Sequence, residues 1–219
     1  MNNKQLYKIT RFFLKPLIIL VDFLQNNFTK NFALMNIGTT EMQSYKNLIK
    51  SFFKKKDFIL DCGCGIGHFC KLFNSKRYVG IEINDNFVTL ARDKNPNYLF
   101  DNFKGKKIDR YKKKINSVLI NNVVHHLSPN DVKKVFSYLK EKTKKRKIKI
   151  LIIEPILPSK YFSIEYFLKV LDIGNYVNDV KGYNQILKKY VKIQDKSITK
   201  FKVNEHFKSS TLIIKGIIK

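Results

Sequence analysis

A glycine-rich loop is the segment of this sequence best suited to holding a small molecule. It reads Asp61-Cys62-Gly63-Cys64-Gly65-Ile66-Gly67 and directly follows a short apolar run. Because glycine has no Cβ atom, Gly63, Gly65 and Gly67 let a ligand approach the backbone more closely than other residues would. Any tight turn between a strand and a helix can also use glycine, so the loop alone predicts only a binding site.

A glutamate at the end of the next apolar run makes the interpretation more specific. Glu82 lies near the end of segment 78–83. In a strand-helix-strand unit its carboxylate lies beside the glycine loop, where it can accept hydrogen bonds from both hydroxyls of a ribose. The alternative is a solvated glutamate at a strand end, and the spacing between the loop and Glu82 favours the ribose role.

Two histidines and a second glutamate are the candidates for catalysis. His125 and His126 follow the apolar run 115–121, and Glu154 closes the run 147–154. Histidine titrates near neutral pH, so either ring is a candidate general base for a hydroxyl substrate, with His125 favoured. Alternatively, one of the histidines has a structural role and packs ahead of the following helix, hydrogen-bonded to the backbone. Glu154 is a substrate contact or base, or else it caps the following helix.

Alternating strands and helices from about residue 41 must position these residues. Apolar runs predict strands at 58–61, 78–83, 97–101, 115–121 and 147–154. Helices are expected after the glycine loop, through Phe69 to Phe73, after a cap at Asn84 or Asp85, and after Ser128 with Pro129. This alternation predicts an α/β fold with a doubly wound, mostly parallel sheet. A C-terminal antiparallel hairpin over 191–203 and 209–218 would make it seven-stranded.

Residues 1–40 are predicted to form an N-terminal helical cap, and 41–219 the main domain. Apolar residues recur at spacings of three and four in the cap, and Pro16 is expected to kink one helix or begin a second. The apolar stretch 12–24 is interrupted and shorter than the ~20 residues that span a bilayer. A basic, amphipathic segment can still lie on a membrane surface, so peripheral membrane contact stays open.

The glycine loop and Glu82 together resemble the cofactor motifs of the class I, Rossmann-like S-adenosylmethionine-dependent methyltransferases. The third glycine of dinucleotide-binding folds falls one residue after Gly67, where this chain has His68. The resemblance covers about residues 45–155. It implies that S-adenosyl-L-methionine is the cofactor, that the loop packs against its methionine part, and that Glu82 and Ile83 belong to the same site.

The resemblance extends to two further strand ends. Asp101 and Asn102 stand where the family places an acidic or amide contact, so Asp101 is expected to accept from the adenine amino group. Asn121 stands where the family often has Asp, and an amide replaces only part of a carboxylate's hydrogen bonding. The expected cofactor-binding residues are Asp61, Gly63, Gly65, Gly67, Glu82, Ile83, Asp101, Asn102 and Asn121.

The basic composition is a weaker sign of an anionic partner than its size suggests. The formal net charge is +26, but 38 lysines stand against 5 arginines, and phosphate recognition favours arginine. The densest lysine clusters, 54–56, 112–114 and 144–147, directly precede predicted parallel strands. They therefore belong at the sheet edge opposite the cofactor. A nucleic-acid or protein substrate is the less favoured alternative.

The three cysteines predict neither a disulfide framework nor a metal site. Cys62, Cys64 and Cys70 are odd in number and contain no Cys-x-x-Cys pair. They indicate a reducing, cytoplasmic setting and are expected to act as small buried hydrophobes.

The acceptor is expected to be a small apolar or aromatic molecule. Ligands of an open parallel sheet bind outside the carboxyl ends of its strands, so the N-terminal helices and segments 122–129 and 155–185 select the acceptor. These segments carry Phe12, Phe13, Tyr161, Phe162, Tyr166, Phe167, Tyr176 and Tyr183. Such residues line pockets but also form helix cores. The predicted reaction is in-line transfer of the sulfonium methyl to an oxygen, nitrogen or carbon nucleophile.

Overall fold

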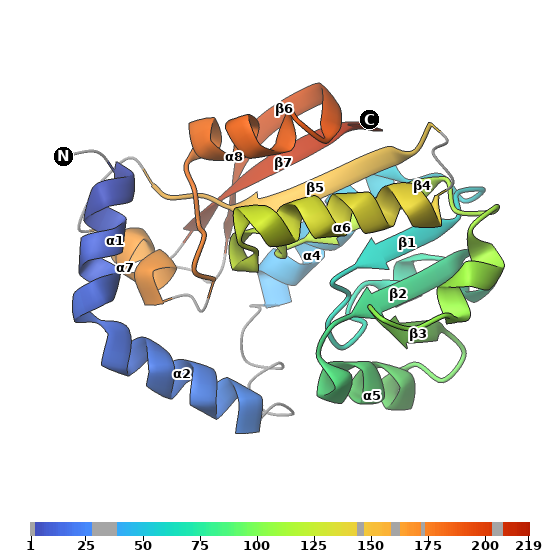
Figure 1. Ribbon diagram of the computed structural model, residues 1–219, viewed down its shortest axis with the longest axis horizontal. Coiled ribbons are helices and arrows are strands. Elements are labelled where there is room, and N and C mark those ends of the chain that lie inside the picture. Colours follow the sequence, from blue (N-terminus) through green and yellow to red (C-terminus); the bar gives the residue numbers. More distant parts are fainter. Residues whose placement is uncertain (1–2, 28–38, 144–146, 159–162, 172–173, 203–207) are drawn as a thin grey trace.

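A seven-stranded sheet organises the computed structural model, which describes residues 3–27, 39–143, 147–158, 163–171, 174–202 and 208–219 (Figure 1). The strand order is β3-β2-β1-β4-β5-β7-β6. The strands are β1 (Ile59–Cys62), β2 (Tyr78–Glu82), β3 (Leu99–Asn102), β4 (Ser117–Asn121), β5 (Lys149–Pro155), β6 (Val191–Lys202) and β7 (Lys208–Ile218). The first five pair in parallel, and β7 pairs antiparallel with both β5 and β6. The predicted sheet is confirmed.

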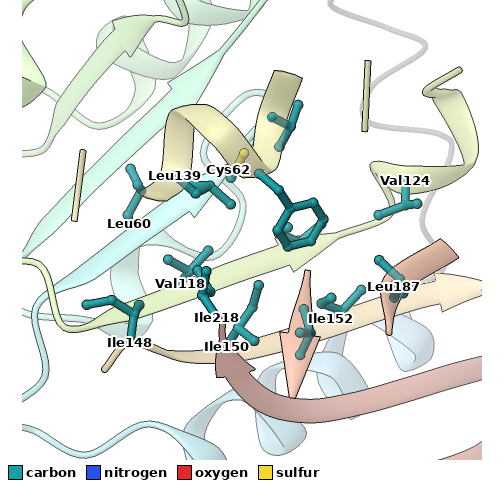
Figure 2. Close-up of a cluster of buried hydrophobic side chains, with 14 of the residues drawn as sticks. Leu60, Cys62, Val118, Val124, Leu139, Ile148, Ile150, Ile152, Leu187 and Ile218 are labelled. Carbon is teal, nitrogen blue, oxygen red and sulfur yellow. The ribbon is translucent and has the colours of Figure 1, made fainter. Parts of the chain in front are cut away.

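Helices cover both faces of the sheet. On one face, α6 (Pro129–Lys142) and α8 (Val180–Leu187) bury Leu139 and Leu187 against strand residues such as Val118 and Ile150 (Figure 2). On the other face lie α4 (Thr39–Phe52) and α5 (Asp85–Lys94), which pack on alternate residues such as Leu119. Strands buried on both faces need apolar side chains at every position, which explains the continuous apolar runs.

Two helix starts are confirmed in their capping residues. Asn84 accepts hydrogen bonds from the backbone of Asn86 and Phe87 at the start of α5. Ser128 accepts one from the backbone of Asp131, and Pro129 is the first residue of α6. These caps fix where the loops after β2 and β4 end.

The predicted helix after the glycine loop is wrong. The chain forms only a 3-10 turn, η1 (Cys70–Leu72), followed by a second, η2 (Ser75–Arg77). Gly67 has φ of 80°, so a right-handed helix cannot begin before the next residue. Asn74 is extended and uses its side chain to cap η2. The remaining residues, 68–73, are too few for a stable α-helix.

Two helices at the N-terminus, α1 (Asn3–Phe13) and α2 (Lys15–Asn27), precede the sheet. They are separated only at Leu14, and Pro16, which lacks an N–H group, lies at the start of α2, as the sequence predicts. Residues 28–38, which make up most of the rest of the expected cap, lie outside the described residues. The expected boundary at residue 40 falls in the first turn of α4. No helix in the described part of the chain is long and apolar enough to span a bilayer.

Helix α1 is held against α7 (Ile164–Leu171). Tyr7 packs in a small apolar cluster with Tyr166 and Val170. Arg11 donates to the carbonyl oxygens of Val170 (2.9 Å) and Gly174 (3.3 Å), which satisfies acceptors at the end of α7. Figure 1 shows α1 and α7 together at the left, the side toward which β5 points. The N-terminal helices therefore lie on the side of the strands' carboxyl ends.

Candidate active site

The glycine loop is closed on one side and open on the other. Gly63, Gly65 and Gly67 have φ of 77°, 53° and 80°, a region that other residues adopt at a cost. The Gly63 N–H donates to the carbonyl of Ile81 in β2 (2.8 Å), which fixes the loop to the sheet. A Cβ atom on Gly63 would lie 2.4 Å from the Val123 side chain, whereas one on Gly65 would meet nothing within 4 Å. A ligand therefore has room at Gly65.

Glu82 lies beside this open position. One carboxylate oxygen accepts from the Gly65 N–H (3.0 Å), and the other accepts from the backbone of Ile83 (2.7 Å) and Asn84 (3.1 Å). Its orientation is therefore fixed before any ligand arrives. The Ile83 side chain is 74% exposed, which gives the site an apolar surface next to the carboxylate.

Asp101 and Asn102 build the turn after β3. The Asp101 carboxylate accepts from the backbone N–H groups of Asn102 (3.1 Å) and Lys107 (2.9 Å). The Asn102 amide donates to the carbonyl of Ile83 (3.2 Å) and the carboxylate of Asp85 (2.7 Å). Asp101 thus holds the turn, and Asn102 ties it to Ile83 and Asp85; the adenine contact expected of Asp101 stays a prediction.

Asp61 is buried beneath the glycine loop. Its carboxylate accepts from the Tyr78 hydroxyl (2.7 Å). Burial raises the pKa of Asp61 to about 7, against the lowering effect of the Tyr78 hydrogen bond, and the nearby charge of Glu82 raises it further. Burial likewise raises the pKa of the Cys62 and Cys64 thiols. The Asp61 carboxylate therefore bonds to Tyr78 of β2, and the cysteines are neutral core residues.

The end of β4 carries a buried acceptor without a donor. The Asn121 side-chain oxygen has no hydrogen-bond partner among the described residues. Leaving such an atom unsatisfied costs about 1–3 kcal/mol, so a ligand that donates to it would stabilise the site. Asn122, the next residue, has φ of 56°, which turns the chain sharply away from the strand. Asparagine tolerates this conformation better than most residues do.

Glu154 holds the loop after β4 from below. Its side chain is fully buried, and one oxygen accepts from the N–H groups of Val123 (2.9 Å) and Val124 (2.8 Å). The other accepts from the His125 N–H (3.2 Å) and pairs with His125 Nδ1 (2.8 Å). This placement leaves neither side chain open to a substrate, and it fits a positioning role better than the catalytic roles expected.

His126 differs from its neighbour because its side chain is exposed. The two imidazole rings lie 4.0 Å apart between centroids. The His125 carbonyl accepts from the Tyr176 N–H (2.8 Å), which joins the loop to the segment after α7. The loop, its histidines and that segment therefore form one connected structure at the carboxyl ends of the strands.

The predicted aromatic set does not gather into one pocket. Tyr166 and Tyr183 are buried in separate apolar clusters, whereas Phe12 and Phe13 point into solvent. Tyr161 and Phe162 lie outside the described residues. Phe167 and Tyr176 are partly exposed. The helical spacing in the sequence predicts which rings share one side of a helix, but it does not predict whether that side faces the core, the solvent or the site.

The individual roles of two residues in segment 122–129 were not predicted from the sequence. Val123 packs directly beneath Gly63, and Asn122 makes the turn that brings it there. The Asn121-Asn122 pair was the available signal, because asparagine is enriched at left-handed positions.

Together these features fit S-adenosylmethionine. The loop is open at Gly65, Glu82 provides acceptors for ribose hydroxyls, Ile83 offers a surface for an adenine ring, and Asn121 has a buried acceptor to offer. No group of metal-ligating side chains occurs among the described residues.

Comparisons with known proteins agree with this geometry. Residues 59–146 match the family described as "Methyltransferase domain". Comparison with curated protein sequences gives no match. The PH0226 protein from Pyrococcus horikoshii OT3 is similar in structure, with a TM-score of 0.60 and 18% identity over 81% of this chain and 89% of that one.

Two further solved structures have the same fold. A SAM dependent methyltransferase from Archaeoglobus fulgidus is 20% identical over 78% of this chain and 94% of its own, with a TM-score of 0.53. The magnesium protoporphyrin IX methyltransferase from Synechocystis PCC 6803 with bound SAH is 14% identical over 92% and 99%, with a TM-score of 0.60. Residues 59–146 therefore match a methyltransferase domain, and the described residues have the fold of these class I methyltransferases.

Proposed function

We propose that this enzyme methylates a small apolar or aromatic molecule. The observation that carries the proposal is the distribution of side chains around the sheet. The carboxyl edge offers Ile83 and the partly exposed rings of Phe167 and Tyr176. The exposed lysines 54–56 instead precede β1, at the opposite edge. One similar structure is named for magnesium protoporphyrin IX, a planar molecule, which supports an acceptor of that class.

Each residue at the site then has a distinct role. Bound S-adenosylmethionine supplies an electrophilic sulfonium methyl group. Glu82 accepts from the ribose hydroxyls, and Ile83 packs on the adenine. Glu154 and His125 are positioning residues, because they fix the backbone that borders the acceptor. His126, the exposed ring of the pair, is the candidate general base for an acceptor that must lose a proton.

RNA and protein acceptors are the alternative, and the overall charge of +26 favours them. Productive RNA binding would need cations at the carboxyl edge, close to the transferable methyl group. The lysine clusters precede the strands instead, so this alternative is less well supported. The three buried free cysteines support a reducing, cytoplasmic setting.

Calorimetric titration with S-adenosylmethionine and S-adenosylhomocysteine tests the cofactor roles. We expect Glu82→Ala to weaken binding at least about tenfold, which corresponds to about 1.4 kcal/mol. Glu141→Ala is the matched control, because this glutamate is 65% exposed on the far end of α6. Equal affinities for all three proteins would contradict the proposal. Methyl transfer is then measured with planar, apolar molecules and with short RNAs as acceptors, and the class that is methylated distinguishes the two alternatives.

A further inference from the structure

A stripe of large apolar side chains lies exposed along the N-terminal helices. The apolar stripe comprises Ile9, Phe12 and Phe13 of α1 and Ile19, Leu20 and Phe23 of α2, each between 45% and 74% exposed. These residues include most of the large exposed apolar side chains of the described chain. A contiguous apolar surface of this kind marks an interaction site more often than an isolated exposed leucine does.

The stripe is one face of a two-faced segment. Its residues recur at helical spacings of three and four, and hydrogen bonds from Leu14 to Thr10 and from Ile18 to Leu14 continue the helical pattern across the break. The opposite face is already used, because Tyr7 and Arg11 bind α7 and the residues after it. The helices are therefore anchored to the domain by one face and present the apolar stripe on another.

The charges along α1 and at the start of α2 are positive, and the sequence of α2 contains one acidic residue, Asp22. Lys8 and Lys15 have exposed side chains, and the sequence of α1 contains no acidic residue. An apolar face flanked by lysines on a helix is the arrangement that lies flat in the headgroup region of an anionic bilayer. The apolar residues could also pack against a second protein chain, but the lysines would stabilise that contact only if the second chain carried acidic residues opposite them.

We propose that the apolar stripe docks this enzyme on an anionic phospholipid bilayer. Apolar side chains would enter the boundary between headgroups and acyl chains, and Lys8 and Lys15 would lie against lipid phosphates. Because α1 packs on α7 at the carboxyl side of the sheet, docking brings the acceptor side of the site close to the membrane. Resting on the proposed function, this identifies the acceptor as an amphiphilic molecule that partitions into the bilayer.

Vesicle co-sedimentation of the full chain tests the docking surface. We expect binding to vesicles that contain phosphatidylglycerol, weakened by salt, and little binding to pure phosphatidylcholine. Replacing both rings, Phe12→Ser with Phe13→Ser, should lower the partition coefficient by about a hundredfold. Lys8→Ser with Lys15→Ser should lower it roughly tenfold on the anionic vesicles only.

Matched controls alter the same chemistry elsewhere. Ile198→Ser removes a 55% exposed apolar side chain from β6, and Lys55→Ser with Lys56→Ser removes exposed charge at the opposite edge. Both controls should bind vesicles like the original chain. Absence of binding to anionic vesicles, or equal binding by the Phe12 and Phe13 variant, overturns the proposal. If the original chain forms a dimer and does not bind vesicles, and the Phe12 and Phe13 variant is a monomer, the proposal is overturned and the stripe binds a second copy of this chain.

The cofactor assay separates this proposal from the proposed function. The Phe12 and Phe13 variant should bind S-adenosylhomocysteine with unchanged affinity by calorimetry, because both original side chains are exposed to solvent, by 73% and 74%. Loss of vesicle binding with intact cofactor binding supports the docking surface. Vesicle binding by a chain that never binds the cofactor would leave docking in place and refute the assignment of the cofactor site.

Discussion

Replacing Glu154 by glutamine tests the role of the buried carboxylate. In the structure this carboxylate accepts from three backbone N–H groups and pairs with His125 Nδ1. An amide keeps one acceptor oxygen, and its NH2 group then faces the N–H of His125, donor against donor. The substitution hardly changes the side-chain volume, so its effect reports the hydrogen bonds and charge of the carboxylate and not its packing.

The magnitude follows from the bonds that change. A buried N–H group without an acceptor costs about 1–3 kcal/mol, and the bonds of Val123 and Val124 each weaken by about 1 kcal/mol when the acceptor loses its charge. We therefore expect Glu154→Gln to lower the free energy of unfolding by about 3–5 kcal/mol. Because Val123 packs under Gly63, the displaced loop should also weaken the binding of S-adenosylhomocysteine.

Urea unfolding followed by circular dichroism measures the first effect, and calorimetry measures the second. Glu141→Gln is the control, since this exposed glutamate should change stability by less than about 0.5 kcal/mol. If Glu154→Gln lowers the free energy of unfolding by less than about 1 kcal/mol, the carboxylate does not organise the loop. Normal stability with lost turnover would instead show that Glu154 acts on the substrate.

Four further substitutions test other parts of the structure. Gly63→Ala should destabilise by about 2–4 kcal/mol in urea, because its Cβ meets Val123, whereas Gly65→Ala should cost about 1 kcal/mol and chiefly block the cofactor in calorimetry. The pKa of Asp61 is raised from 3.8 to about 7, so its stabilising contribution is complete below pH 3.8 and is lost as pH rises toward and through 7. Asp61→Asn should lack this decline. The free energy of unfolding, measured in urea and plotted against pH, should therefore fall more between pH 3.8 and 7 for the original chain than for the variant, and parallel plots would contradict the assignment. Arg11→Met should raise hydrogen exchange in α1 and α7 while leaving the sheet protected; unchanged exchange would show that its bonds to α7 contribute little.

The sheet could be predicted because its signals are local. Apolar runs that end in Asp61, Glu82 and Asn121 each mark a buried strand and its carboxyl end. The caps at Asn84 and Ser128 are equally local, because side chain and backbone partners lie within three residues. The order of the strands within the sheet was not predicted, because no single run states which strands are neighbours.

Features that depend on contacts between distant residues were not predictable. The sequence states that Glu154 ends a strand, but only the fold places it beneath Val123 and His125, about thirty residues earlier. The absent helix after the loop had a signal, since Gly67 and Asn74 both oppose a helix. The prediction instead followed the general alternation of strands and helices.

The position of β6 at the end of the sheet has a consequence for solubility. Among the described residues no strand pairs with its outer edge, and an exposed strand edge of this length invites pairing with another chain. Lys192, Lys196 and Lys200 recur along it with exposed side chains, and a bulge between Ile193 and Asp195 interrupts its regular pairing with β7. Like charges oppose edge-to-edge stacking of two copies. The lysine-rich composition thus protects the protein from aggregation, and concentrated salt, which screens those charges, weakens that protection.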